Sequence, residues 1–421
     1  MFTISTSYLD NGLKIMLRNV PNQRTVSCGI FVGQGVKDED ESNNGISHLI
    51  EHLMFKINSK HSKTGIKENL QELKYIGARY NATTTKDYTC FSIDGLSRDI
   101  NKMLEVLSYL VVDKEKVSKE DLNVEKEVVL REAEGYLMSS SQIGERIGQA
   151  LWGDYSIGQL VIGKKDVIRN IEPEMVDYLI YNAYIPENCV LVIVGGFDTE
   201  VVLQQVNKYF SAWEDKNKYE KKYITKAKPG IYIDDSFSGG RSTIGIGLLA
   251  YCSNDWRSRY VELLKDVLVK PGSKLFYELR EKKGLVYSIY GISTALMTSG
   301  NMGIAFSANN NQVEDIIKIV IDELRYLVSN GVDEGRLENI KRGRETEILY
   351  GIESTANQLN AIGKSAIRGD MFLLEDEIRE INKINKDKLD QVIKDLFLTE
   401  NLCMAVLGDV NIDNLLPLLE F

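Results

Sequence analysis

The chain repeats itself at a nearly constant distance along the sequence, and this repeat limits the folds that it can adopt. A strand pattern that ends in glycine, at residues 188–196, recurs at 401–409, which is an offset of 213. A helix pattern at 117–132 recurs at 332–347, which is an offset of 215. Repeats of this kind predict two similar halves built from the same elements.

Each half combines strand patterns with long helices, which is typical of the α+β class. We therefore expect two homologous α/β-sandwich domains, each a mostly antiparallel sheet covered by helices. The N-terminal domain would span residues 1–215, and the C-terminal repeat would span 230–421. The charged stretch at 213–222, followed by Lys228-Pro-Gly230, is the expected linker between them.

Local patterns predict the elements of the first half. Asn11-Gly12 is a turn signal, so the strands expected at 13–17 and 26–32 would form a hairpin. Apolar residues at helical spacing and β-branched runs predict the elements that follow, which are helices at 66–77, 98–111 and 118–134, and paired strands at 77–85 and 88–93.

Residues 44–55 predict a short helix with two different faces. One face is an apolar stripe formed by Ile46, Leu49, Ile50 and Leu53. The other carries His48, Glu51 and His52. Two imidazoles at i and i+4 can bind one divalent ion, and a carboxylate at i+3 can act beside it as a general base. Two of the only three histidines in the chain lie here, so a metal site is favoured over an accidental pairing on a solvated face.

The acidic run at 38–41 lies immediately before this helix. Acidic groups at a helix N-terminus complement the helix dipole, and we favour this role over attraction of basic substrates. A polar insert at 58–65 follows the helix. It contains His61, the third histidine, which we expect to be exposed.

A zinc site that keeps one position for water needs a third protein ligand. From Glu125 onward, the helix expected at 118–134 offers four glutamates, which are Glu125, Glu127, Glu132 and Glu134. Glu125 and Glu132 are seven residues apart and share a face. We choose Glu132 as the ligand and Glu125 as a supporting carboxylate that orients an imidazole. Spacing alone leaves Glu127, Glu134 and an exposed acidic face as alternatives.

Composition excludes some classes of function. A net charge of −10 and a pI near 5.2 give no electrostatic support to nucleic-acid binding. No apolar run is long enough to cross a bilayer, and the N-terminus has no secretory pattern, so we expect a cytoplasmic chain without a membrane partner. The five cysteines lie far apart in apolar segments without C-x-x-C spacing, so we expect reduced, buried thiols that do not bind zinc.

The second half contains no histidine, so it cannot repeat the metal site. Its most distinctive segment is 273–287, where a helix through 275–280 should end near Gly284 and a strand should start at Leu285. On residue chemistry alone, Arg280 is best explained as a surface cation and Tyr287 as a core aromatic.

Three motifs together resemble the pitrilysin family (M16) of zinc metallopeptidases. They are Asn43-Asn-Gly45 followed by His48-Leu-Ile-Glu-His52, the segment from Glu125 to Glu132, and the segment 275–287. The resemblance covers nearly the whole chain. The length and the two-half repeat are similar to the branch built from short subunits, such as those of mitochondrial processing peptidase.

The resemblance implies a role for each matching residue. One zinc ion per chain would be bound by His48, His52 and Glu132. Glu51 would be the catalytic base, and Glu125 would be the supporting carboxylate. Asn81 would contact the backbone of bound peptide, which adds a strand to a sheet edge. Arg280 and Tyr287 would face the zinc and polarise the scissile carbonyl. In this branch a partner chain supplies that domain, which implies a homodimer or a heterodimer with composite active sites.

The chain departs from the family pattern in three places. A small glycine-threonine element usually follows the zinc helix, and here Lys56 is followed by Ile57 and the polar insert instead. Prolines common near 156–163 are absent, and the glycine-rich run of the second half is reduced to residues 270–274. These differences leave substrate selection and the natural partner open.

We therefore expect a zinc endopeptidase that cleaves peptides or unstructured segments inside a chamber formed by two chains. One rival function is a non-catalytic subunit that keeps the fold as an assembly partner. Such relatives usually lose motif residues, which this chain keeps. Another rival is a peptidase that acts only with a different partner chain, for example in the maturation of a ribosomally made peptide.

Overall fold

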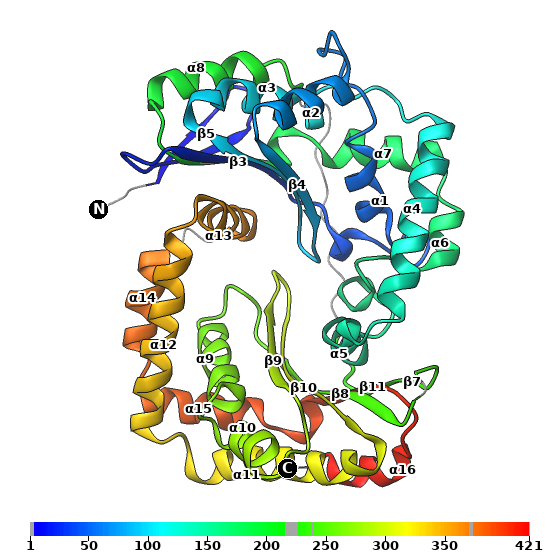
Figure 1. The fold of residues 1–421 in the computed structure, drawn as a ribbon, viewed down its shortest axis with the longest axis vertical. Coiled ribbons are helices and arrows are strands. Elements are labelled where there is room, and N and C mark those ends of the chain that lie inside the picture. Colours follow the sequence, from blue (N-terminus) through cyan, green and yellow to red (C-terminus); the bar gives the residue numbers. More distant parts are fainter. Residues whose placement is uncertain (1–3, 215–225, 238, 370–373, 421) are drawn as a thin grey trace. The chain divides into compact units, whose positions relative to one another are not determined.

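The computed structural model describes residues 4–214, 226–237, 239–369 and 374–420 of the 421-residue chain. The chain divides into two compact units, each with one sheet and its own helices (Figure 1). The first unit comprises Met1–Ala133, Val161–Lys222 and Ile348–Asp376, and the second comprises Glu134–Leu160, Tyr223–Glu347 and Glu377–Phe421. Most of the expected linker lies outside the described residues, and the domain limits at 215 and 230 stay predictions.

The first unit contains a six-stranded sheet in the order β1-β2-β6-β3-β5-β4. Its strands are β1 Ser5–Tyr8, β2 Lys14–Asn19, β3 Thr25–Val32, β4 Arg79–Thr84, β5 Thr89–Leu96 and β6 Cys189–Gly195. Only β2 and β6 run parallel, and all other neighbours are antiparallel. The mostly antiparallel sheet is as expected.

The predicted hairpin between residues 13–17 and 26–32 is wrong. The strand β6 lies between β2 and β3 and pairs with both of them. The Asn11-Gly12 turn instead joins β1 to β2, and Gly12 adopts the positive φ of 89° that such a turn requires. A turn signal identifies the turn, but it does not identify a strand that is inserted from 170 residues further along the chain.

Helices cover both faces of the first sheet. Most of the buried core lies on one face, under α1 Ile46–Leu53, α2 Ile66–Tyr75, α3 Ile100–Val111, α4 Lys119–Leu137, α6 Lys165–Arg169, α7 Pro173–Ala183 and α8 Thr199–Phe210. On the other face, Phe31 and Val192 pack against Leu359 and Ile362 of α13 Thr355–Arg368 (Figure 1). The helices expected at 66–77, 98–111 and 118–134 are confirmed.

The second unit contains a five-stranded sheet in the order β7-β11-β8-β10-β9. Its strands are β7 Ile231–Asp234, β8 Arg241–Ala250, β9 Ile289–Ala295, β10 Gly300–Asn309 and β11 Leu402–Leu407. Again one pair, β7 and β11, is parallel and the others are antiparallel. The order and directions match β2-β6-β3-β5-β4, which confirms the two homologous halves.

The helices of the second unit include one from the first half of the chain. They are α5 Ile143–Trp152, α9 Arg257–Val269, α10 Lys274–Phe276, α11 Val313–Asn330, α12 Glu334–Ile352, α14 Leu374–Lys383, α15 Lys386–Leu396 and α16 Ile412–Leu415. In α5, Ile143 and Ile147 pack against Ala405 and Cys403 of β11. Because α13 in turn covers the first sheet, the two halves exchange a helix.

Equivalent residues of the two halves form the same individual hydrogen bonds. Asn188 and Asn401 each donate from Nδ2 to a carbonyl five residues earlier, at 2.8 and 3.1 Å. Gly195 and Gly408, at the ends of β6 and β11, both have a φ of +146°, and a Cβ on either would lie within 2.3 Å of a neighbouring atom. Equivalent positions of the two halves therefore carry the same local structure.

The structure also tests the expectations for the cysteines, for His61 and for membrane-spanning segments. All five cysteines are described and none forms a disulfide, and burial raises the pKa of Cys28, Cys90 and Cys403. His61 is exposed, as expected, and its Nε2 lies 2.7 Å from Asp113 Oδ2. Among the described residues, none of the helices combines the length and the apolar character needed to span a bilayer.

Candidate metal centre

The helix α1 has the two faces that its sequence predicts. Ile46, Leu49, Ile50 and Leu53 are almost completely buried, whereas His48, Glu51 and His52 are partly exposed on the other side. The two imidazole rings meet edge to face, with centroids 4.9 Å apart and an angle of 82° between their planes. One helical turn thus places both rings beside each other.

A buried glutamate from the acidic run fixes the N-terminus of α1. Glu39 Oε2 accepts hydrogen bonds from Gly45 N at 2.8 Å and from Asn44 Nδ2 at 2.9 Å, and its Oε1 accepts one from Ser47 N at 2.9 Å. Burial raises the pKa of Glu39, although these hydrogen bonds oppose the rise. The structural role expected for the acidic run is confirmed for this residue.

Glu132 of α4 completes a set of three possible metal ligands. Its Oε2 lies 3.4 Å from His52 Nε2 and 3.8 Å from His48 Nε2, and the ligand atoms of all three side chains lie within 4.8 Å of one another. Zinc bonds of about 2.1 Å in tetrahedral geometry place ligand atoms about 3.4 Å apart. The three side chains therefore fit a zinc ion, and Glu127 and Glu134 lie outside the set. No other group of this kind occurs among the described residues.

Glu125 lies behind one of the ligands. Its Oε2 is 3.3 Å from His52 Nδ1, and its Oε1 is 3.1 Å from Lys56 Nζ. With Nδ1 as the donor to this carboxylate, Nε2 of His52 presents its lone pair toward Glu132. The ammonium group of Lys56 thus lies beside this buried carboxylate and offsets its charge.

Glu51 is held by a residue that sequence reasoning missed. Its Oε2 accepts a hydrogen bond of 2.5 Å from Thr84 Oγ1, at the end of β4. Burial raises the pKa of Glu51, and the Thr84 hydrogen bond and the nearby His52 oppose this rise. Strand alternation places Thr84 on the same face as Tyr80 and Ala82, which pack into the core, but no sequence pattern indicates that α1 lies over this face.

Asn81 lies in the middle of β4, which is the edge strand of the first sheet. It is exposed and pairs with Ser92 of β5, and none of the described residues forms a strand along the outer side of β4. The structure therefore places Asn81 at an open sheet edge whose Thr84 contacts the metal centre.

Arg280 and Tyr287 lie together in the second unit. The Arg280 guanidinium, in the π-helical turn Tyr277–Lys282, is 5.6 Å from the centre of the Tyr287 ring. Tyr287 is 82% exposed, so its interpretation as a core aromatic is wrong. The strand expected from Leu285 begins only at Ile289, as β9, so Tyr287 belongs to the loop before that strand. The pair is thus available to a ligand.

Comparisons with known sequences identify the family of the chain. The profile described as "Insulinase (Peptidase family M16)" matches residues 14–163, and the profile described as "Peptidase M16 inactive domain" matches residues 170–344. Together they cover most of the chain. The chain belongs to peptidase family M16.

Individual relatives of this family member span nearly its whole length. A protein described as the uncharacterized zinc protease YmxG of Bacillus subtilis is 27% identical over 405 residues, which is 94% of this chain and 96% of the relative. The β subunit of the mitochondrial-processing peptidase of Neurospora crassa is 24% identical, over 96% of this chain and 88% of that subunit. The crystal structure of a protease from Helicobacter pylori has the same fold, with a TM-score of 0.89, 19% identity, and coverage of 97% and 100% of the two chains.

The two profiles divide the proposed site residues of this M16 chain between them. The insulinase profile spans the three possible ligands, Glu51 and Glu125, whereas the inactive-domain profile spans Arg280 and Tyr287. The possible metal chemistry therefore belongs to the first half of the chain.

Proposed function

We propose that this M16 chain is a zinc-dependent endopeptidase that holds one zinc ion through His48, His52 and Glu132. The observation that carries the proposal is the convergence of these ligand atoms from α1 and α4, with the carboxylate of Glu51 on the same helical face. The zinc protease names of the relatives support the choice of metal.

The residues around the site supply the parts that peptide hydrolysis needs. When bound, zinc acts as a Lewis acid and makes water acidic enough to ionise near neutral pH. Glu51 accepts the proton of the attacking water and returns it to the leaving amine. Thr84 holds the Glu51 carboxylate in place, and Glu125 orients His52.

Peptides or unstructured segments are the proposed substrates. An extended peptide can add a strand to the open edge of β4, where Asn81 is a candidate contact, and such pairing recognises the backbone more than the side chains. Arg280 and Tyr287 are the proposed stabilisers of the oxyanion, a contribution of about 3 kcal/mol per donor.

The proposed active form is a dimer, either of two copies or with a related chain, that encloses substrate in a chamber. The N. crassa relative is named as a β subunit, which supports assembly with a second chain. A non-catalytic or partner-dependent subunit is the second candidate, because residues 170–344 match the profile of an inactive domain.

Hydrolysis of a quenched fluorescent peptide tests the catalytic proposal. The purified chain should cleave the peptide, and a chelator or Glu51→Gln should abolish cleavage. Glu127→Gln is the matched control, because Glu127 is an exposed glutamate of α4 outside the ligand set. A zinc-loaded chain that cleaves nothing alone but gains activity with a related subunit supports the second candidate instead.

A further inference from the structure

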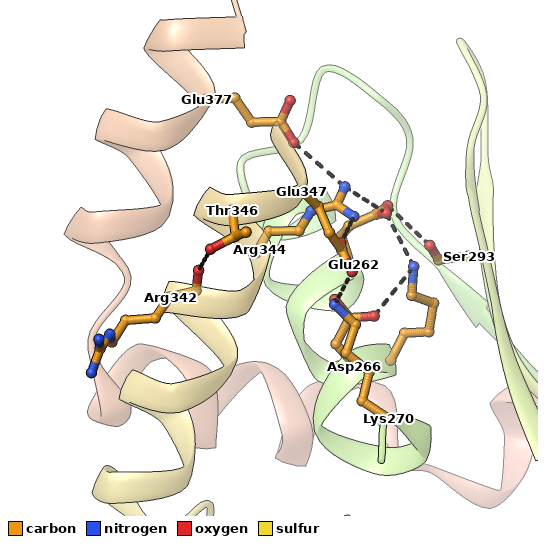
Figure 2. A network of polar contacts seen from close by, with 10 residues as sticks. Glu262, Asp266, Lys270, Ser293, Arg342, Arg344, Thr346, Glu347 and Glu377 are labelled. Atoms are coloured by element: carbon orange, nitrogen blue, oxygen red, sulfur yellow. Dashed lines mark hydrogen bonds and ion pairs between the residues drawn. The ribbon is translucent and has the colours of Figure 1, made fainter. Parts of the chain in front are cut away.

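A cluster of charged side chains joins α9, α12 and the edge strand β9 within the second unit (Figure 2). We name it the α9–α12 cluster. Its members are Glu262, Lys265, Asp266, Lys270, Ser293, Arg344 and Glu347. Three are carboxylates and three are cations, and the proposed reaction uses none of them.

The contacts within the α9–α12 cluster form a closed ring. Arg344 Nη2 lies 3.0 Å from Glu262 Oε1, and its Nη1 lies 3.4 Å from Glu347 Oε2. Lys270 Nζ lies 2.7 Å from Glu347 Oε1 and 3.0 Å from Asp266 Oδ2. Lys265 Nζ lies 3.2 Å from Glu262 Oε1 and 3.6 Å from Asp266 Oδ1. Each carboxylate therefore contacts two of the three cations.

The electrostatics keep the ring ionised. Burial opposes the charge on Glu262, but Lys265 and Arg344 outweigh it and lower the pKa of this carboxyl. Burial also opposes the charge on Arg344, but Glu262 and Glu377, the latter 3.6 Å away, outweigh it and raise the pKa of the guanidinium. Glu262 and Arg344, which join α9 to α12, are thus held in their charged forms by their partners.

The strand register gives Ser293 an equivalent in the first unit. Paired residues can be followed from β6 through β3 and β5 to β4, and in the second unit from β11 through β8 and β10 to β9. Along these two paths, Thr84 of β4 and Ser293 of β9 fall at the same position. Both hydroxyls donate to a glutamate on the helix beside the edge strand, although the two glutamates are three positions apart in the alignment of the helices, in which Glu51 corresponds to Lys265. Thr84 donates to Glu51 at 2.5 Å, and Ser293 donates to Glu262 Oε2 at 2.9 Å.

The helices align in the same way. At an offset of 214, the four buried apolar residues of α1 match four buried residues of α9, which are Tyr260, Leu263, Leu264 and Val267. The helices α4 and α12 align at an offset of 215. Ahead of them, Val117 N donates to Asp177 Oδ1 at 3.0 Å, and Val332 N donates to Asp390 Oδ1 at 2.9 Å. The two helix pairs are therefore equivalent residue by residue.

With these offsets the α9–α12 cluster occupies the positions of the metal centre. The corresponding pairs, with the residue of the first unit named first, are His48 and Glu262, Glu51 and Lys265, His52 and Asp266, Lys56 and Lys270, Thr84 and Ser293, Val129 and Arg344, and Glu132 and Glu347. The three ligand positions hold three carboxylates. The position of the base holds a lysine, and an arginine stands where a valine is buried in the first unit.

We propose that the α9–α12 cluster is the metal-free counterpart of the metal centre, in which Lys265, Lys270 and Arg344 take the place of the ion. A metal ion bound in the first unit would connect α1 to α4 through its ligands, a statement that rests on the proposed function. In the second unit the guanidinium and the two ammonium groups connect α9 to α12 through three carboxylates. Because each carboxylate of the ring already contacts two of these cations, the ring requires no further cation from solution.

The cluster has a positioning role because it fixes both ends of one segment. Lys270 directly follows α9, and Ser293 lies in β9, so the chain between them, residues 271–292, is tied to the cluster at both ends. That segment carries Arg280 and Tyr287. The cluster thus positions the two residues proposed to contact the substrate, and it does so whether or not metal is present.

Rebuilding the metal centre in the second unit tests the equivalence. The variant with Glu262→His, Lys265→Glu, Asp266→His and Arg344→Val should bind one zinc ion per chain more than the wild type, measured by metal analysis after gel filtration. The control adds Glu347→Gln to these four substitutions and should lose that additional ion. A folded variant with the metal content of the wild type would overturn the equivalence.

Hydrogen exchange tests the positioning role, and it tests the proposal even if the rebuilt variant fails to fold. In the full-length chain, Arg344→Met should speed amide exchange in residues 271–292 about tenfold, with or without a chelator. Lys318→Met is the control, because it removes an exposed ion pair with Glu314 in the same unit. Unchanged exchange in Arg344→Met, or faster exchange in this segment of the wild type on chelation alone, would refute the proposal. Neither readout depends on hydrolysis.

Discussion

Replacing Glu125 by glutamine should weaken zinc binding without removing a ligand. The Glu125 carboxylate is buried and lies 3.3 Å from His52 Nδ1. Hydrogen bonds to charged groups contribute about 1.5–3 kcal/mol. Because this contact is long and glutamine keeps an acceptor oxygen, we expect a loss of about 1–2 kcal/mol, which corresponds to a zinc Kd about 5–30 times higher.

Competition with a chelator near neutral pH measures this effect. Glu127→Gln, an exposed change of the same kind on the same helix, should leave the zinc Kd unchanged. Lys56→Met should change it by less than about threefold, because the Lys56 side chain is half exposed and solvent screens its pairing with Glu125. If Glu125→Gln binds zinc as tightly as Glu127→Gln, the carboxylate does not orient His52 and the reasoning fails.

Three further predictions follow from the same contacts. Thr84→Val should lower kcat about tenfold while the zinc content stays constant, because it removes the hydrogen bond to Glu51, and Thr84→Ser should retain activity; equal kcat values for the two variants would contradict this. Mixing Glu51→Gln chains with Arg280→Ala chains should restore activity if the sites are shared, and no recovery despite subunit exchange would exclude composite sites. Glu262 has a lowered pKa, so its stabilising effect is present above its unfolded pKa of about 4.5 and is lost as the pH falls through its folded pKa. The Tm difference between the wild type and Glu262→Gln should therefore shrink below about pH 4.5, as calorimetry would measure, and a constant difference would contradict the sign.

The metal face of α1 could be predicted because helical spacing alone places His48, Glu51 and His52 together. The third ligand could not be derived this way. Five glutamates share α4, and which of them meets the imidazoles depends on how α4 docks on α1, a contact between residues about 80 positions apart. Family resemblance pointed to Glu132, and the geometry agrees with it.

Long-range pairing explains the errors and omissions. The insertion of β6 between β2 and β3 leaves no trace in the Asn11-Gly12 turn, and the contact of Thr84 with Glu51 depends on where β4 lies under α1. Tyr287 is exposed because β9 begins at Ile289, four residues after the expected start at Leu285, so Tyr287 lies in the loop before the strand. Local patterns thus identified most elements, but not the partners of each element.

The exchanged helix α13 affects the order in which a ribosome can complete the protein. The last strand of the first sheet ends at Gly195, but the apolar face that contains Phe31 stays uncovered until α13, which ends at Arg368, has been synthesised. At about 5–20 residues per second, that delay is roughly 10–35 s. A nascent chain therefore carries the complete histidine motif well before it can finish the domain that holds it, and early fragments should depend on chaperones.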